Sequence, residues 1–79
     1  MRQAVASGAR MGIAPFKRRG RRLEPREVVI CRDEDSAGRR GRRMLERYDG
    51  LVFFRIECGP EGDVWTEVVA TVGLPGEEP

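Results

Sequence analysis

The stretch VVICRDEDSAG, residues 28–38, decides the predicted fold of this chain. It opens with four consecutive apolar residues, 28–31, a run typical of a strand buried on both faces of a parallel sheet. An acidic cluster, Asp33-Glu34-Asp35, follows directly, and a small-residue step ends at Gly38. Open α/β sheets keep their ligand sites beyond the carboxyl ends of such strands. Two carboxylates one residue apart can converge there on one hard cation, so the stretch predicts both a strand and a candidate cation site.

A helical pattern follows the acidic cluster. Small or apolar residues recur on one face of the expected helix at Ala37, Gly41, Met44, Leu45 and Tyr48. We expect Ser36 to cap its start and Gly50 to end it in the left-handed conformation. A mid-helix glycine costs about 1 kcal/mol relative to alanine. Gly41 on the apolar face therefore predicts a close approach of helix and sheet.

The segments around this helix set the predicted fold class. A second apolar run, LVFFRIE at 51–57, predicts another strand, and a last helix is expected from Asp63 to about Val72. Strand, helix and strand with short connections form a right-handed βαβ crossover. The predicted class is α/β, a small βαβ(α) unit with parallel strands over 27–72. A basic, Gly/Arg-rich and partly flexible segment over 1–26 precedes it, and a flexible tail over 73–79 follows.

Length and composition limit the class of protein to which this chain can belong. With 79 residues and 8.9 kDa, the chain has room for one small domain with a modest core. There is no histidine, and Cys31 and Cys58 lie far apart, which argues against structural zinc and predicts two buried, reduced thiols in an intracellular protein. No apolar run reaches membrane-spanning length, and the N-terminal residues lack the apolar segment of a signal peptide. A cytoplasmic protein without a membrane partner is expected.

Charge is distributed unevenly along the chain. Residues 1–43 hold 13 of the 15 basic and 5 of the 13 acidic residues, a net charge of +8, and residues 44–79 carry −6. Fourteen of the fifteen basic residues are Arg, whose guanidinium group suits bidentate phosphate contact. The candidate phosphate or nucleic-acid contacts are Arg39, Arg40 and Arg43 on the expected helix, and Lys17, Arg18 and Arg19 in the basic run before it. A solvated charged surface is the alternative for both groups.

Several chemistries use an Asp-x-Asp pattern. An EF-hand loop that began at Asp33 would need an oxygen ligand where Ala37 stands and a Glu where Met44 stands, so that interpretation fails twice. A haloacid-dehalogenase-type phosphatase would use Asp33 as nucleophile and Asp35 as acid/base, but Ala37 departs from that pattern and no suitable downstream lysine is present. Alternatively, the two acids only cap the N-terminus of the helix.

The order of residues over 27–69 resembles the second half of a Toprim domain, the metal-binding module of primases, topoisomerases and related nucleases. The resemblance rests on VVICRDEDSAGRRGRRML, on LVFFRIE after it, and on the acidic, Trp-containing segment GPEGDVWTEVV, as in phage- and plasmid-type primases. It implies that Asp33 and Asp35 bind Mg²⁺ or Mn²⁺ and that Gly38 permits a tight turn into the helix. It also implies a DNA or RNA partner and phosphoryl-transfer chemistry in DNA replication.

The chain departs from the Toprim pattern at one point. Toprim domains carry a catalytic Glu on an earlier strand, whereas no acidic residue precedes Glu24 here. The resemblance then implies a truncated, C-terminal portion that is weakly active or inactive alone, with a protein partner that supplies the missing half. Catalytic residues and enzymatic activity are left unassigned. The alternative is a non-enzymatic, Arg-rich nucleic-acid-binding module.

Overall fold

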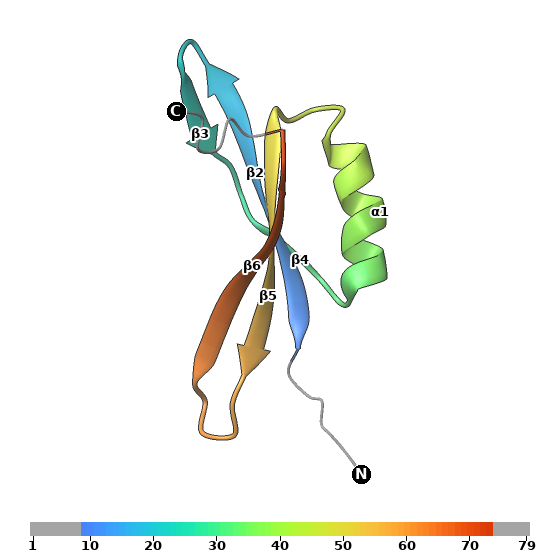
Figure 1. Cartoon of the computed structure of the whole chain (residues 1–79), viewed down its shortest axis with the longest axis vertical. Coiled ribbons are helices and arrows are strands. Elements are labelled where there is room, and N and C mark those ends of the chain that lie inside the picture. The colour runs from blue at the N-terminus through green and yellow to red at the C-terminus, as the bar shows by residue number, and fades with distance from the viewer. Residues whose placement is uncertain (1–8, 74–79) are drawn as a thin grey trace.

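The computed structural model describes residues 9–73, which form five strands and one helix (Figure 1). In chain order these are β2 (Arg10–Arg19), β3 (Arg22–Pro25), β4 (Val29–Cys31), α1 (Glu34–Met44), β5 (Gly50–Cys58) and β6 (Val64–Val72). The molecule is elongated, 49 × 24 × 21 Å, and the β5–β6 hairpin reaches well past the start of α1 (Figure 1).

Strand β2 is the centre of a five-stranded sheet, in which four strands have the order β3-β2-β5-β6 and β4 also pairs with β2. Along one edge of β2, β4 pairs with its first half, Met11 opposite Cys31, and β3 pairs with its second half, Phe16 opposite Pro25. Along the other edge β2 pairs with β5, which pairs in turn with β6. Every strand pair among the described residues is antiparallel.

The predicted parallel βαβ fold was therefore wrong. Strands β4 and β5 do run in the same direction on either side of α1, but β2 lies between them and pairs antiparallel with both. The segment over 1–26, expected to stand apart from the sheet, contributes β2 and β3. The apolar run over 28–31 is not buried on both faces, because Ile30 is 52% exposed on the face away from the helix. Strands from the unit expected over 27–72 thus share one sheet with β2 and β3.

The second error is the last helix, since residues 64–72 form β6. Val64, Val68 and Val72 recur every four residues, a spacing that fits one face of a helix and also the period-two alternation of a strand. The segment VWTEVVATV is rich in β-branched residues, which favour strands. A bulge opposite Phe53 and Phe54 shifts the β5–β6 register near the middle of the hairpin.

The core lies between α1 and one face of the sheet. Its buried side chains are Met11, Ile13, Cys31, Ala37, Met44 and Leu51, with Val29, Tyr48 and Phe53 partly buried against them. The apolar helix face is confirmed at Ala37, Gly41 and Met44. The close approach at Gly41 is confirmed as well, because a Cβ there would lie 2.5 Å from Cζ of Phe53.

The ends of the helix differ from those expected. Helix α1 begins at Glu34 with Asp33, not Ser36, as its N-cap. It ends at Met44 with Leu45 as C-cap, so Leu45 is 39% exposed and does not join the core face. Gly50 is the first residue of β5 and not a helix terminator.

The loop after α1 is attached to the β2–β3 hairpin. The Nζ atom of Lys17 donates a 2.7 Å hydrogen bond to the carbonyl oxygen of Arg47. The carboxylate of Asp49 accepts from the backbone N–H of Arg18 at 2.6 Å, and the N–H of Asp49 donates to the carbonyl of Phe16 at 2.9 Å. These bonds hold the C-terminal end of α1 and the hairpin at the same end of the molecule (Figure 1).

Candidate nucleic-acid interface

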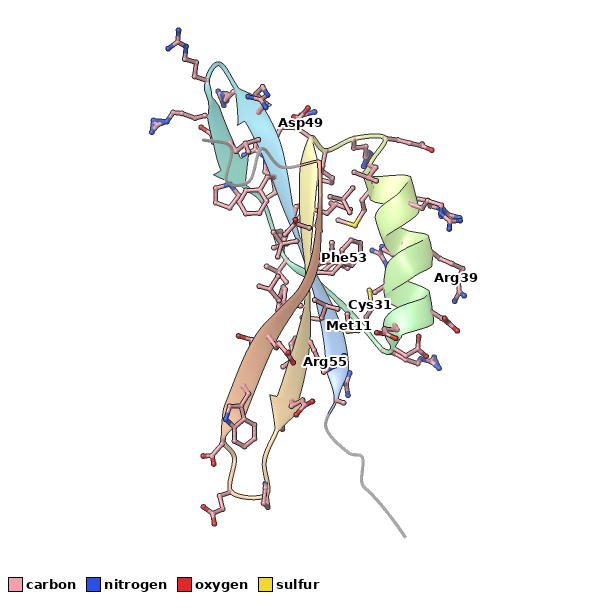
Figure 2. All side chains as sticks on the ribbon, in the orientation of Figure 1. Met11, Cys31, Arg39, Asp49, Phe53 and Arg55 are labelled. Carbon is pink, nitrogen blue, oxygen red and sulfur yellow. The ribbon has the colours of Figure 1, made fainter. Side chains whose placement is uncertain are left out.

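The outer face of α1 carries a cluster of arginines, which we call the α1 arginine surface: Arg39, Arg40, Arg42 and Arg43. All four are exposed, because Ala37, Gly41 and Met44 turn the opposite side of the helix towards the sheet. Figure 2 shows Arg39 directed away from the sheet. The 3.6-residue period of the helix thus places apolar and basic side chains on opposite sides.

These four guanidinium groups have no acidic partner within ion-pair distance in the part of the chain that the structure describes. The ion pairs found there join Arg19 to Glu24 at 3.7 Å, Arg26 to Glu24 at 3.6 Å, and Arg55 to Glu67 at 3.1 Å. All of them lie in the sheet or, for Arg26, in the loop directly after β3. None of the four guanidinium groups is therefore held in an ion pair within the described residues, and each is available to an anion.

Two shallow hollows meet at Arg40 and Arg43. One, of about 220 Å³, is lined by Ser36, Arg39, Arg40 and Arg43. The other, of about 390 Å³, lies where the C-terminal half of α1 faces β4 and is lined by Val29, Arg40, Arg43, Met44, Glu46, Arg47 and Tyr48. Each guanidinium group presents several N–H donors in a fixed, planar arrangement. Two guanidinium groups at the edge of one hollow can therefore donate hydrogen bonds to one phosphate from two directions.

The basic residues of the β2–β3 hairpin do not extend the α1 arginine surface in the way the sequence predicts. The ammonium group of Lys17 donates a hydrogen bond to the carbonyl oxygen of Arg47, and Arg19 forms an ion pair with Glu24. Arg18 pairs with Leu23 on the sheet face away from α1. The predicted set of six thus divides into three arginines on one helix face and three hairpin residues with other surroundings.

One arginine of the surface was missing from the predicted set. Arg42 lines a further depression together with Arg39, Arg43 and Glu46. Its place on the polar side of the helical pattern was the signal that could have included it.

The acidic cluster has a structural role at the start of α1. The Oδ1 atom of Asp33 accepts a 2.9 Å hydrogen bond from the backbone N–H of Ser36. That bond and then the Ser36 hydroxyl lower the pKa of Asp33 below its ordinary value of 3.8. Desolvation opposes them, and the positive charges of Arg32 and Arg39 add weaker lowering effects. Asp35 lies in the first helical turn, where negative charge favours the helix dipole.

The magnesium site expected at Asp33 and Asp35 stays a prediction. Among residues 9–73 no group of three or more His, Cys, Asp or Glu side chains could hold a metal ion. Gly38, which was expected to permit a tight turn into the helix, lies inside α1.

The cysteine prediction holds only in part: both thiols are free, but Cys31 is buried and Cys58 is exposed. Within the described range, no helix combines the length and apolar character that a membrane span requires. Comparisons with models of protein families, with curated proteins and with solved structures found no match for this chain.

Proposed function

We propose that this chain is a non-enzymatic nucleic-acid-binding module that contacts backbone phosphates through the α1 arginine surface. The observation that carries the proposal is the set of four exposed guanidinium groups on one helix face with no carboxylate within ion-pair distance among the described residues. Phosphate contact by Arg and Lys supplies most of the sequence-independent affinity for nucleic acids.

The dimensions of the surface suit a repeating anion. Arg39 and Arg43 are one helical turn apart, about 6 Å along the helix axis. Double-stranded DNA presents one negative charge per about 1.7 Å of its axis, so several phosphates lie within that span. A single free phosphate would occupy only one pair of guanidinium groups, whereas a polyanion engages all of them together.

The N-terminal end of α1 contributes little to such binding. Asp33 already satisfies an N–H group of the first turn, and Glu34 and Asp35 add negative charge beside it. Phosphates are repelled there and attracted further along the helix. The interface therefore centres on Arg40 and Arg43, next to the two hollows that these residues share.

Charge-matched variants test the proposal. One variant replaces Arg39, Arg40 and Arg43 with glutamine, and a control replaces Arg19, Arg22 and Arg26 of the hairpin region with glutamine. Each removes three positive charges, but Arg19 and Arg26 already face Glu24. Binding to a labelled DNA duplex and to a labelled single-stranded RNA is measured by fluorescence anisotropy.

We expect the helix variant to lose at least tenfold in affinity and the hairpin variant to stay within about threefold of wild type. Equal losses in both variants would mean that binding follows net charge alone, and the proposal would be wrong. A comparison of the two probes shows which nucleic acid the surface favours.

A further inference from the structure

The sheet has one covered face and one open face. Helix α1 packs on one side, and the part of the chain that the structure describes places no helix or strand on the other (Figure 1). Every residue of the buried core belongs to the helix side. The opposite side, which we call the open sheet face, is defined by the strand register.

The open sheet face consists almost entirely of apolar and uncharged side chains. Its members are Gly12, Ala14 and Phe16 of β2, Leu23 and Pro25 of β3, Ile30 of β4, Val52, Phe54, Ile56 and Cys58 of β5, and Val64, Thr66, Val68 and Thr71 of β6. The ring of Phe54 lies over Gly12, so a Cβ at that position would collide with the ring. Ile30, Val64 and Val68 are 52%, 61% and 63% exposed.

Charged residues are nearly absent from this face, although 35% of the chain is charged. By register, only Arg10 and Arg18 of the paired strand residues point to it, and both lie towards the ends of β2. The helix side of the same strands carries Lys17, Arg19, Arg22, Glu24, Arg55, Glu57 and Glu67. A contiguous apolar face of this kind marks an interaction surface.

The size of the face matches a protein interface. Four strands spaced about 4.8 Å apart, over about nine residues that rise about 3.3 Å each, give about 600 Å². Two such faces together reach about 1,200 Å², the lower limit of a specific and stable interface. Sheets that pack face to face in this way lie about 10 Å apart.

The charges at the two ends of the molecule determine the orientation. The turn between β2 and β3 lies within KRRGRR, residues 17–22, which holds five basic residues and no acid. The turn between β5 and β6 lies at the opposite end of the long axis, and Glu57, Glu61 and Asp63 surround it without a basic residue between Ile56 and Thr66 (Figure 1). Two copies with parallel axes would place like charges together. Antiparallel axes place the basic end of each copy beside the acidic end of the other.

We propose that the open sheet face packs against the same face of a second copy of this chain, with the long axes of the two copies antiparallel. The dimer has twofold symmetry, and each copy contributes the same surface to the interface. The twofold axis lies in the plane between the two sheets and runs perpendicular to the strands. Helix α1 lies on the outer side of each sheet, so both α1 arginine surfaces stay exposed in the dimer. The proposal does not depend on nucleic-acid binding.

Sedimentation equilibrium over a range of protein concentrations tests the interface. Wild type should reach twice its 8.9 kDa mass, whereas Ile30→Glu and Val68→Glu should each remain monomeric. Both side chains are more than half exposed in the single chain, so the variants should keep the wild-type circular dichroism spectrum. Leu45→Glu, a similar change on the helix side, should leave the dimer intact.

Two outcomes would overturn the face-to-face dimer. One is a wild-type protein that stays monomeric at every concentration. The other is a dimer that Val68→Glu abolishes and Ile30→Glu spares, because Ile30 lies across the sheet from β6 and that result would indicate pairing of β6 edges.

Cross-linking with a flexible bismaleimide tests the orientation. Cys58 lies at the acidic end of the open sheet face and is exposed in the single chain, and Arg21→Cys adds a thiol at the basic end. Peptide mapping of the dimeric variant should find residue 21 of one copy linked to Cys58 of the other, with few links between equivalent residues. A majority of links from Cys58 to Cys58 would show parallel axes and contradict the proposal.

Discussion

At the scale of single residues, Asp33 decides how the acidic cluster is understood. The sequence allowed it to be a metal ligand or a helix cap, and the 2.9 Å bond from the Ser36 N–H to its carboxylate gives it a capping role. Sequence alone could not separate the two roles, because an N-cap and a metal ligand both follow a strand and both favour Asp.

Substitution of Asp33 tests that role. Asparagine keeps the acceptor oxygen and alanine removes it, so at neutral pH Asp33→Ala should melt lower than both wild type and Asp33→Asn. The lowered pKa of Asp33 has a further consequence: its charged form stabilises the fold above the ordinary value of 3.8, and this contribution disappears as the pH falls through the folded-state pKa. Wild type should therefore lose its advantage over Asp33→Asn in that acidic range.

Melting curves recorded from neutral to acidic pH, with and without Mg²⁺, measure both effects. If Asp33 is only a helix cap, Mg²⁺ should leave the melting temperatures of wild type, Asp33→Asn and Asp33→Ala unchanged. A Mg²⁺-dependent rise in wild type that both substitutions abolish would contradict the capping account and favour a metal site.

The two glycines of α1 make a matched pair. A Cβ at Gly38 would meet nothing within 4 Å, whereas a Cβ at Gly41 would lie 2.5 Å from Cζ of Phe53 and 3.4 Å from Cδ1 of Leu51. Gly38→Ala should stabilise the protein by up to about 1 kcal/mol through helix propensity. Gly41→Ala should destabilise it by about 1 kcal/mol, because displacement of the Phe53 ring outweighs the same gain.

Chemical denaturation of the two alanine variants measures this difference. Phe53→Leu, which removes the Cζ atom, should recover part of the stability lost in Gly41→Ala. Equal stabilisation by both alanines would show that α1 does not approach the sheet as closely as described.

At the scale of elements, the sequence predicted α1, β4 and β5 but missed β2. Gly12 and Pro15 interrupt the pattern of β2, and proline is rare in a central strand because it has no N–H to donate. Pro15 is accommodated because it lies where the neighbouring edge changes from β4, whose first residue Val29 is opposite Ile13, to β3, whose last residue Pro25 is opposite Phe16. This accommodation depends on pairing between distant segments and is invisible to local periodicity.

The hydrogen bond from the Arg18 N–H to the Asp49 carboxylate belongs to this scale, since it joins the loop between α1 and β5 to the β2–β3 hairpin. Asp49→Ala removes the acceptor for the Arg18 N–H and should lower the free energy of unfolding by about 1 kcal/mol. Glu46→Ala, an exposed acid on the helix side with no ion pair among the described residues, is the control and should change stability little. Urea denaturation compares them; equal effects would mean that the loop bond adds nothing.

At the scale of the whole molecule, the fold separates the charges of the sequence in space: one end is basic, the other end is acidic, and the outer face of α1 carries arginines. The contrast between residues 1–43 and 44–79 was visible in the sequence. Its arrangement was not, because it requires β2 to lie between β4 and β5 and the two hairpin turns to point in opposite directions. The arginines on α1 could be predicted from helical periodicity, and the different surroundings of Lys17 and Arg19 could not, because they depend on contacts with Arg47 and Glu24.

The most direct test of the central claim, phosphate binding by the α1 arginine surface, is the salt dependence of DNA binding. The measurement is the slope of log K against log salt concentration for wild type and for the glutamine variant at Arg39, Arg40 and Arg43. Each phosphate contact contributes about 0.9 to that slope, so the variant should be shallower by about 2 to 3, while the hairpin variant keeps the wild-type slope. Identical slopes for wild type and the helix variant would show that these arginines do not contact phosphates, and the claim would be wrong.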